Sequence, residues 1–443
     1  MEGDWTTTCY CDVGFMAKGS WLAIESGLLA CKIVDMSTVF EDQEVEGCKS
    51  GPPLGNVQPS VKVLSNWEEL ESLVAEWNAI LERNRKLTIF STPEWLGAWW
   101  RAFGNDKQLY ALSFRDSQGV LVGLLPLFLQ RIEFSILPSL RELRFVGDGS
   151  SDSDNLDFIV LPGYERAVAR SLVQHLATAR GWDICRLNVM PSDSVTANIF
   201  LQEITEARWN CETSPVPWTA IELPETWEKY LKQLSSKERG KVGYLSRRLE
   251  KRYRVRFYKC GSMKELPASL EELFRLHQKR WESRGESGTF ASSARRKFYY
   301  DMAQRFLSRD WLAFWALELN GTVVASQFGF RCGDTVYALQ EGFDPAYAND
   351  SVGYVLRSYS LRELIELGVR RYDFLGGQND SKLRWTAISG NYLNVHAARA
   401  GTRGSLYLSL IRSFKTTKSH VRSFLHPSLV TLFKSIRHKS PPE

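Results

Sequence analysis

The chain has 443 residues, of which 44% are hydrophobic and 24% charged, and these values are ordinary for a soluble globular protein. The length predicts two or three domains, and no uncharged apolar run reaches the roughly 18 residues that a membrane-spanning helix needs, which excludes a spanning protein. The net charge of +5 is unevenly distributed, since residues 1–60 carry nine acidic and three basic side chains, whereas residues 402–443 carry eight basic and one acidic. A chain-wide nucleic-acid-binding charge is therefore excluded.

Residues 1–60 are predicted to form a poorly ordered extension. Acidic residues precede its weakly apolar segment, the reverse of a secretory signal, and Met36 is a second candidate beside Met1 for the start of translation. The eight cysteines form no Cys-x-x-Cys pair, and the six histidines lack metal-ligand spacing. The sequence therefore predicts no disulfide framework and no metal site, and it favours the reducing cytosol.

From residue 61 the pattern becomes regular. Asn66-x-x-Glu69 resembles a capping box that opens a helix through Arg83, and Pro93 suits the first turn of a second helix. Hydrophobic periodicity then predicts four strands, a helix and a further strand, at residues 108–114, 120–130, 142–146, 156–160, 165–179 and 182–189 in that order.

The second half repeats this order. Three strands, a helix and a last strand are predicted at residues 311–319, 322–330, 335–340, 352–367 and 372–375. Asn320-Gly321, between the first two strands, is a strong hairpin signal. The turn glycines Gly119 and Gly321 are 202 residues apart, and Gly181 and Gly368, each between a helix and a strand, are 187 residues apart. These offsets indicate a large internal duplication.

Composition marks the boundaries of the duplicated unit. Pro215-Val-Pro217 precedes a strand at 218–223 and one or two helices at 227–253, and residues 231–256 contain ten Lys/Arg and two Glu. Near the end, residues 411–437 predict an amphipathic helix broken at Pro427. The predicted division is an extension, a first lobe, a second lobe with the donor site, and a basic helical tail, at residues 1–60, 61–215, 216–401 and 402–443.

A loop of small residues opens the helix predicted at 352–367. Its bare backbone N–H groups and the helix dipole could bind a pyrophosphate without any lysine. Alternatively, Ser351 is only a helix N-cap and Gly353 only a close-packing residue. The residues predicted to bind a cofactor here are Asn349, Ser351, Val352 and Gly353.

The order of hairpin, third strand, glycine-bearing loop, helix and strand resembles the GNAT acyltransferase fold. A closer resemblance covers about residues 61–400 and rests on the segments Leu276-His-Gln-Lys-Arg280-Trp281, Gly288-Thr-Phe290, Gly342-Phe-Asp-Pro-Ala-Tyr347, Ser351-Val-Gly353, Tyr372-Asp-Phe-Leu-Gly376 and Lys382-Leu-Arg-Trp385. Together they are similar to the tandem-GNAT, FemAB-like family that includes the CelD-like proteins of cellulose and exopolysaccharide loci. The resemblance implies an α+β fold of two GNAT lobes, with mixed central sheets flanked by helices. The loop departs from the family's usual R/Q-x-x-G-x-G/A pattern.

Three candidate catalytic residues follow from this arrangement. Glu341, at a strand end before the loop, is a general base or else a turn carboxylate. Asp373 lies in an apolar strand, so burial could raise its pKa, or it pairs with Arg370 or Arg384. Lys382 holds a donor phosphate or the developing negative charge, unless it is a plain surface charge.

Candidate substrate-binding residues lie in several places. The basic helix either binds phosphates or is a solvated face, and His277 either contacts substrate or is a packed residue. The substrate-binding candidates are Lys237, Arg239, Lys241, His277, Arg280, Trp281 and Arg384. In the first lobe, the acidic segment Asp148–Asp157 either binds a sugar or amine acceptor or forms a polar turn.

The sequence thus predicts a cytoplasmic acyltransferase that moves an acyl group from acyl-CoA, with acetyl-CoA as first choice, to an amine or hydroxyl of a polysaccharide or cell-envelope precursor. One alternative is a FemAB-type transferase that uses aminoacyl-tRNA, the only nucleic acid then expected as a partner. Another is a catalytically silent scaffold of an exopolysaccharide-synthesis complex. The basic tail either lies on the inner face of an anionic membrane or packs on the second lobe.

Overall fold

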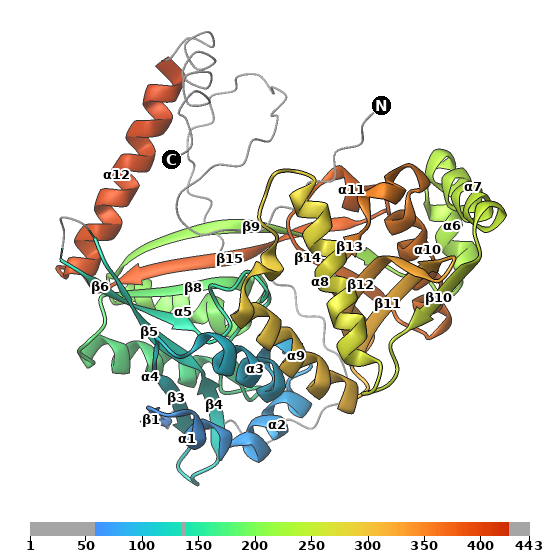
Figure 1. Ribbon diagram of the computed structural model, residues 1–443. Coiled ribbons are helices and arrows are strands. Elements are labelled where there is room, and N and C mark those ends of the chain that lie inside the picture. Colours follow the sequence, from blue (N-terminus) through green and yellow to red (C-terminus); the bar gives the residue numbers. More distant parts are fainter. Residues whose placement is uncertain (1–57, 135–137, 425–443) are drawn as a thin grey trace.

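The fold is described from a computed structural model, which describes residues 58–134 and 138–424, with side chains up to residue 413. The predictions for residues 1–57, Met36 among them, and for residues 425–443 lie outside the described residues. Figure 1 shows helices packed around long, twisted sheets.

The first lobe follows the predicted order of elements. It consists of β1 (Ser60–Leu64), α1 (Trp67–Glu71), α2 (Val74–Arg83), η1 (Ile89–Ser91), α3 (Pro93–Phe103), β2 (Gln108–Leu109), β3 (Ala111–Arg115), β4 (Leu121–Leu125), β5 (Leu127–Ile132), β6 (Leu140–Phe145), β7 (Ile159–Val160), α4 (Glu165–Thr178), β8 (Ile184–Pro191) and α5 (Val195–Glu206). The strand predicted at 120–130 is divided at Pro126, which has no N–H to donate to a ladder. Its halves join different sheets, β4 in a four-stranded sheet and β5 in an eleven-stranded one.

The second lobe repeats this plan after a linking strand. Its elements are β9 (Asn210–Glu222), α6 (Trp227–Gln233), α7 (Ser236–Arg252), β10 (Val255–Lys259), α8 (Leu266–Glu282), η2 (Thr289–Ala291), α9 (Ser293–Ser308), β11 (Leu312–Leu319), β12 (Thr322–Cys332), β13 (Thr335–Phe343), η3 (Pro345–Asp350), α10 (Val352–Glu366), β14 (Arg371–Gly376), α11 (Asp380–Leu383), β15 (Ile388–Ala398) and α12 (Arg403–Phe424). The predicted hairpin is confirmed, since β11 and β12 pair antiparallel across Asn320-Gly321.

The two lobes are duplicates of one α+β unit. In each lobe two strands pair in parallel across a helix, β6 with β8 across α4 and β13 with β14 across α10. The glycines predicted to be equivalent share a backbone conformation. All four have positive φ: Gly119 and Gly321, Gly181 and Gly368. The prediction of two tandem lobes with mixed sheets is therefore confirmed.

The lobes exchange their last strands. β9 follows the first lobe in sequence but pairs antiparallel with β14 of the second, whereas β15 follows β14 but pairs with β8 of the first. β9 and β15 also pair with each other, from Ile388 with Ala220 to Ala398 with Asn210, and run side by side across the molecule in Figure 1. The exchange joins both lobes into the eleven-stranded sheet. The predicted division at residues 215/216 falls within β9.

The second lobe's sheet separates two cores. On one face α8 and α9 pack over β11 and β12 and continue into the first lobe's core, which includes Trp95 and Trp99 of α3. On the other face α6, α7 and α10 cover the sheet around Trp315 and Tyr372. This layering leaves the ends of β13 and β14 directed toward the first lobe.

The C-terminal helix α12 begins against β9 and β15, where Leu408 is buried, and then extends away from the sheets (Figure 1). It starts at Arg403, eight residues before the predicted start at Ile411. Among the described residues, no helix combines the length and apolarity that crossing a membrane requires.

Candidate active site

A cavity of about 260 Å³ lies between the two lobes. β13 and β14 pair in parallel only as far as Tyr337 with Asp373, and beyond that point residues 338–341 and 374–376 line the cavity. β6 and β8 likewise pair up to Arg144 with Arg186, and residues that follow these two positions, among them Asp148 after β6 and Asn188 in β8, line the same space. Because parallel strands that part leave a gap, the equivalent gaps of both lobes open into one cavity.

The second parallel strand of each lobe has a left-handed kink beside the cavity, near its end. Val189 at the end of β8 has φ +51°, and Leu375 in β14 has φ +60°, a conformation that costs energy in non-glycine residues. The Val189 N–H donates to Asn394 Oδ1 (2.8 Å), and the Leu375 N–H donates to Asp373 Oδ1 (2.7 Å). These hydrogen bonds hold the strand ends in the strained shape that lines the cavity.

Asp373 therefore has a structural role, because it holds the kink at Leu375. It does not line the cavity, and its Oδ2 pairs with Arg371 at 3.3 Å, not with the predicted Arg370 or Arg384. The predicted partner was wrong because Arg371, two residues away on the same strand, lies on the same face as Asp373. Burial raises the pKa of Asp373 as predicted in direction, although Arg371 opposes the rise.

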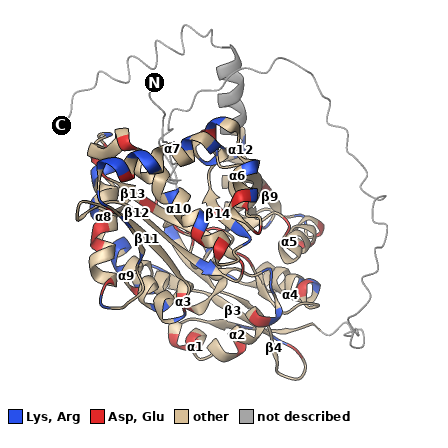
Figure 2. Cartoon of the chain, turned by 90° about the vertical axis from the view of Figure 1, so that its right-hand side faces the viewer, with Lys and Arg blue, Asp and Glu red and all other residues tan. Residues whose placement is uncertain are grey.

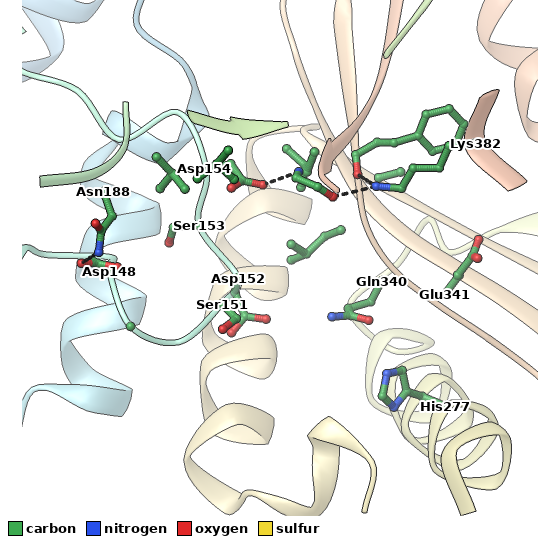
Figure 3. Close-up of a pocket in the computed structure, with 18 of the residues that line it drawn as sticks. Asp148, Ser151, Asp152, Ser153, Asp154, Asn188, His277, Gln340, Glu341 and Lys382 are labelled. Carbon is green, nitrogen blue, oxygen red and sulfur yellow. Dashed lines mark hydrogen bonds between the residues drawn. The ribbon is translucent and has the colours of Figure 1, made fainter. Parts of the chain in front are cut away.

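Asp154, Gly376 and Lys382 connect the two lobes at the cavity wall. Asp154 Oδ2 accepts a hydrogen bond from the Gly376 N–H (2.8 Å). Lys382 Nζ holds the same turn from the other side, because it donates to the carbonyl oxygens of Phe374 (3.1 Å), Gly376 (2.7 Å) and Gly377 (3.0 Å). Figure 3 shows this line of contacts from Asp154 to Lys382. All three ammonium protons of Lys382 are thereby directed at backbone oxygens.

The pKa values of Asp154 and Lys382 are both shifted in the direction that favours the neutral side chain. Burial raises the pKa of Asp154 to about 6; the Gly376 N–H and Lys382 oppose this shift, while Asp373 and Asp152 reinforce it. Burial lowers the pKa of Lys382 to about 8, against the attraction of Asp154. A carboxylate with a pKa near 6 can both exist as the anion at neutral pH and accept a proton, as a general base must.

Glu341 lies in the cavity between two buried arginines. It forms ion pairs with Arg357 and, at 3.7 Å, with Arg280, and 30% of its side chain remains exposed. Burial alone would raise the pKa of Glu341, but the two arginines outweigh it and hold the pKa below its ordinary value. These contacts favour a permanent anion that fixes the arginines over a base that takes up protons.

The acidic segment Asp148–Asp157 forms the opposite wall, with Asp148, Asp152 and Asp154 lining the cavity. Both lobes anchor this segment. From the first lobe, Trp95 and Trp99 of α3 donate to Ser153 Oγ (2.9 Å) and Ser150 Oγ (3.0 Å).

From the second lobe, α9 holds the buried Asp152 of this segment. Arg295 pairs with its carboxylate at 3.1 Å, and the Tyr299 O–H donates to it at 3.0 Å. At the other end of the segment, Asp148 accepts hydrogen bonds from Arg144 and Asn188, both at 2.9 Å. The segment lines the cavity, and acceptor binding by it stays a prediction.

His277, Arg280 and Trp281 line the cavity from α8. The helix can approach β13 because Gly342 has no side chain, since a Cβ there would lie 2.6 Å from the backbone nitrogen of His277. Trp281 Nε1–H donates to His277 Nε2 (2.9 Å). The structure thus brings five predicted site residues together: Glu341, Lys382, His277, Arg280 and Trp281.

The predicted phosphate loop lies outside the cavity. Ser351 has φ +55° and caps α10 without a side-chain hydrogen bond, and Val352 is buried in the second core. Asn349 contributes its carbonyl oxygen to Arg248, and the neighbouring Asp350 pairs with Arg252 of α7 at 2.5 Å. A Cβ on Gly353 would meet only Phe343, at 3.8 Å, so the first turn of α10 is open there.

Lys237, Arg239 and Lys241 lie on α7, which contacts this loop through Arg248 and Arg252. Figure 2 shows Lys and Arg positions along α7. Lys237 and Arg239 are exposed, whereas Lys241 is half-buried with its Nζ 4.6 Å from the ring centroid of Tyr354. Arg384 ends α11 and is near enough to Lys241 to lower the pKa of that lysine, after burial as the larger cause. The predicted site residues therefore form two groups, one in the cavity and one around the start of α10.

Helix α10 connects the two groups. Gly353 lies at its first turn, and Arg357, four residues later on the same face, lines the cavity at the gap between β13 and β14. Arg357 also stacks over Phe374 at 5.0 Å from the ring centroid. Sequence reasoning missed Arg357, for which the helical spacing from Gly353 was the available signal. It named the acidic segment Asp148–Asp157 but did not single out Asp154 within it. Among the described residues, no group of three His, Cys, Asp or Glu side chains could hold a metal ion.

Comparisons with known proteins agree with this architecture. Residues 236–383 match the family described as the acetyltransferase (GNAT) domain, which covers the second lobe from α7 to α11. The crystal structure of FemX shares 11% identity over 76% of this chain and 98% of that chain, with a TM-score of 0.53. No curated protein sequence matches the chain.

Two further solved structures align over most of their length. L-PGS from Bacillus licheniformis has 11% identity, covers 77% of this chain and 95% of that one, and has a TM-score of 0.44. A tandem GNAT protein from the clavulanic acid biosynthesis pathway has 12% identity, covers 77% and 99%, and has a TM-score of 0.41. The second lobe thus matches the GNAT domain family over residues 236–383, and at 11% identity the likeness to FemX concerns the fold alone.

Proposed function

We propose that this protein is a GNAT-type acyltransferase that moves an acyl group, in the first instance acetyl from acetyl-CoA, to an amine or hydroxyl of a polysaccharide or cell-envelope precursor bound between the lobes. The observation that carries the proposal is the cavity itself. The gap between β13 and β14 of the GNAT-type lobe opens there onto Asp154 of the other lobe.

The arrangement of α10 supports a donor site in the second lobe. The phosphates of the donor would bind at the first turn of α10, where Gly353 leaves open space, and the pantetheine arm would follow the helix face toward Arg357. The thioester would then reach the cavity through the gap between β13 and β14. Exposed Lys237 and Arg239 on α7 would attract the same phosphates.

The acceptor would attack the thioester directly. Its nitrogen or oxygen forms a bond to the carbonyl carbon while Asp154 takes its proton, and the tetrahedral oxyanion then collapses and expels the CoA thiolate, which is protonated from solvent. Lys382 is a positioning residue in this scheme, because its hydrogen bonds hold the Gly376 turn that binds Asp154.

The aminoacyl alternative has one specific observation in its favour. Exposed basic residues are spaced along α7 from Lys237 to Arg252, and a polyanion such as RNA would use more of them than CoA. Because acyl-CoA and charged tRNA are both intracellular, we propose a cytosolic location with either donor.

A mass-spectrometric turnover screen tests the proposal. Purified full-length protein is incubated with acetyl-CoA or with aminoacyl-tRNA and a panel of amino sugars, nucleotide-linked sugars and peptidoglycan precursors. The proposal expects acceptor-dependent release of CoA that is insensitive to ribonuclease. Transfer that ribonuclease abolishes would select the tRNA alternative, and no transfer from either donor would favour the silent scaffold.

We also propose that the basic tail contacts anionic lipid. Leu406 and Leu410 of α12 are 64% and 43% exposed, and the basic residues that follow would face phosphate headgroups. Truncation after Ser413 keeps buried Leu408 in place and removes most of the basic residues. Sedimentation with anionic vesicles should recover the full-length chain in the pellet and the truncated chain in the supernatant; equal recovery of both in the supernatant would reject this idea.

A further inference from the structure

The ring of His277 is held in one tautomer. Its Nε2 accepts a hydrogen bond from the Trp281 indole N–H at 2.9 Å, one helical turn along α8. A ring nitrogen that accepts a hydrogen bond carries no proton, so the single proton of the neutral imidazole is on Nδ1. The tautomer is therefore fixed by a contact that no substrate needs to supply.

The Nδ1 atom is buried and has no hydrogen-bond partner among the described residues. His277 is only 2% exposed, yet it borders the cavity, and Figure 3 shows its ring beside Gln340 and Glu341 at the cavity wall. Buried donors are rarely left unpaired, because the missing hydrogen bond costs folding stability. A donor left this way at a cavity wall indicates a partner that arrives with a ligand.

The surroundings of His277 keep the ring neutral and fixed. Phe290 packs edge-to-face against it at 4.9 Å, and the backbone of α8 is pressed onto β13 at Gly342. Burial lowers the pKa of His277 to about 3, with Arg280 and Arg295 adding to the shift and Glu341 opposing it. The ring is thus an uncharged donor throughout the physiological range.

The cationic side chains Lys382, Arg357 and Arg280 at this wall are already engaged. The three protons of Lys382 point at backbone carbonyls, and both Arg357 and Arg280 pair with Glu341. An acyl carbonyl that enters through the gap between β13 and β14 would pass Gln340 and Glu341, which is the part of β13 against which His277 lies.

We propose that His277 is the neutral hydrogen-bond donor of an oxyanion site, whose Nδ1–H binds the acyl carbonyl oxygen as the tetrahedral intermediate forms. The inference rests on the proposed acyl transfer and adds a named role within it. Because a neutral imidazole donates a hydrogen bond without giving up its proton, the oxyanion stays an anion and can collapse to expel the thiolate. Trp281 acts through His277 and is a positioning residue.

The kinetic test replaces His277 with phenylalanine, which keeps an aromatic ring and removes the N–H. Loss of an oxyanion donor lowers kcat about 10²- to 10³-fold, and we expect KM for the acceptor to change little. His175, a half-buried histidine of α4 that contacts Tyr110, supplies the matched control, and H175F should keep the wild-type kcat. An H277F variant with wild-type kcat, or one with only a raised KM, would overturn the inference.

A spectroscopic test does not depend on substrate. Long-range proton–nitrogen spectra of 15N-histidine-labelled full-length protein, assigned by comparison with H277F, should show His277 protonated on Nδ1 alone from pH 5.5 to 8.5. Protonation on Nε2, or titration within this range, would overturn it. If H277F fails to fold, W281F serves instead, with a mixture of tautomers and a kcat lowered several-fold as the expected result and unchanged values as the contrary one.

The outcomes separate the inference from the function on which it rests. Wild-type protein that transfers acyl groups while H277F does so equally well overturns only the role of His277. Wild-type protein that transfers no acyl group from any donor overturns both.

Discussion

Replacing Asp154 with asparagine separates the proposed proton uptake by Asp154 from its hydrogen bond to Gly376. The amide oxygen of asparagine can still accept the Gly376 N–H, so the link between the lobes is retained while the ability to take up a proton is lost. The proposed base contributes to catalysis only through that proton. Activity and stability should therefore respond in opposite directions.

The expected change in the free energy of unfolding follows from the raised pKa of Asp154. The pKa of Asp154 rises from 3.8 to about 6 on folding, and two pKa units at 1.36 kcal/mol each correspond to about 3 kcal/mol against the ionised form. The penalty is absent below pH 3.8, where the group is protonated in both states, and complete above pH 6. Wild-type stability should thus lose up to about 3 kcal/mol as pH rises through this window, and the asparagine variant should not.

Chemical denaturation at pH 5 and pH 8, with steady-state kinetics on the same samples, measures both effects. D154N should be more stable than wild type at pH 8, with a smaller difference at pH 5, while its kcat falls about 10²- to 10⁴-fold, as expected for loss of a general base. Asp106 is an exposed aspartate that pairs with Lys107, and D106N is the matched control with neither effect. A D154N protein that is equally destabilised at both pH values, or that retains its kcat, would refute the reasoning.

Three further substitutions test the surroundings of the cavity. Asp152→Asn, two residues away, should destabilise the fold by about 3–5 kcal/mol because it removes the carboxylate that pairs with the largely buried Arg295. An unfolding free energy like that of D154N would contradict this. Gly342→Ala should lower the free energy of unfolding by about 1–3 kcal/mol and lower kcat, because its Cβ would meet the α8 backbone. Gly240→Ala, on the open surface of α7, is the control and should raise the free energy of unfolding by about 0.5–1 kcal/mol. Denaturation and steady-state kinetics measure both variants. Gly353→Leu should leave unfolding unchanged and abolish acetyl-CoA binding in calorimetry, so retained affinity would remove the donor site from α10.

The sequence was sufficient for the elements whose signals are local. The helix at Pro93 begins where proline and the Thr92 cap direct it, and the Asn320-Gly321 hairpin forms as its turn chemistry predicts. A second copy of that helix start was present but not recognised. Phe90 and Phe290 lie 200 residues apart, each in a short turn before a helix capped by a hydroxyl, and the second of these helices, α9, carries Arg295.

The strand exchange could not be predicted from the sequence. β9 and β15 both mix polar and apolar residues, and nothing within either one specifies whether its partner is β8 or β14, because pairing depends on contacts about 150–210 residues away in sequence. The contact between Asp154 and Gly376 in the cavity could not be predicted for the same reason. The aspartates after β6 were visible, but only the fold brings Asp154 to Gly376, and neither residue could indicate the other.

The exchange also imposes an order on biosynthesis. The first lobe leaves the ribosome with the edge of β8 uncovered, and it remains so until β15 has been made, which at 5–20 residues per second takes about 10–40 s. An uncovered strand edge invites pairing with other chains, so this interval is when the nascent protein is most exposed to aggregation and most in need of a chaperone. A prematurely terminated chain would be trapped in that state, and loss of either copy in evolution would leave the surviving one without its last strand.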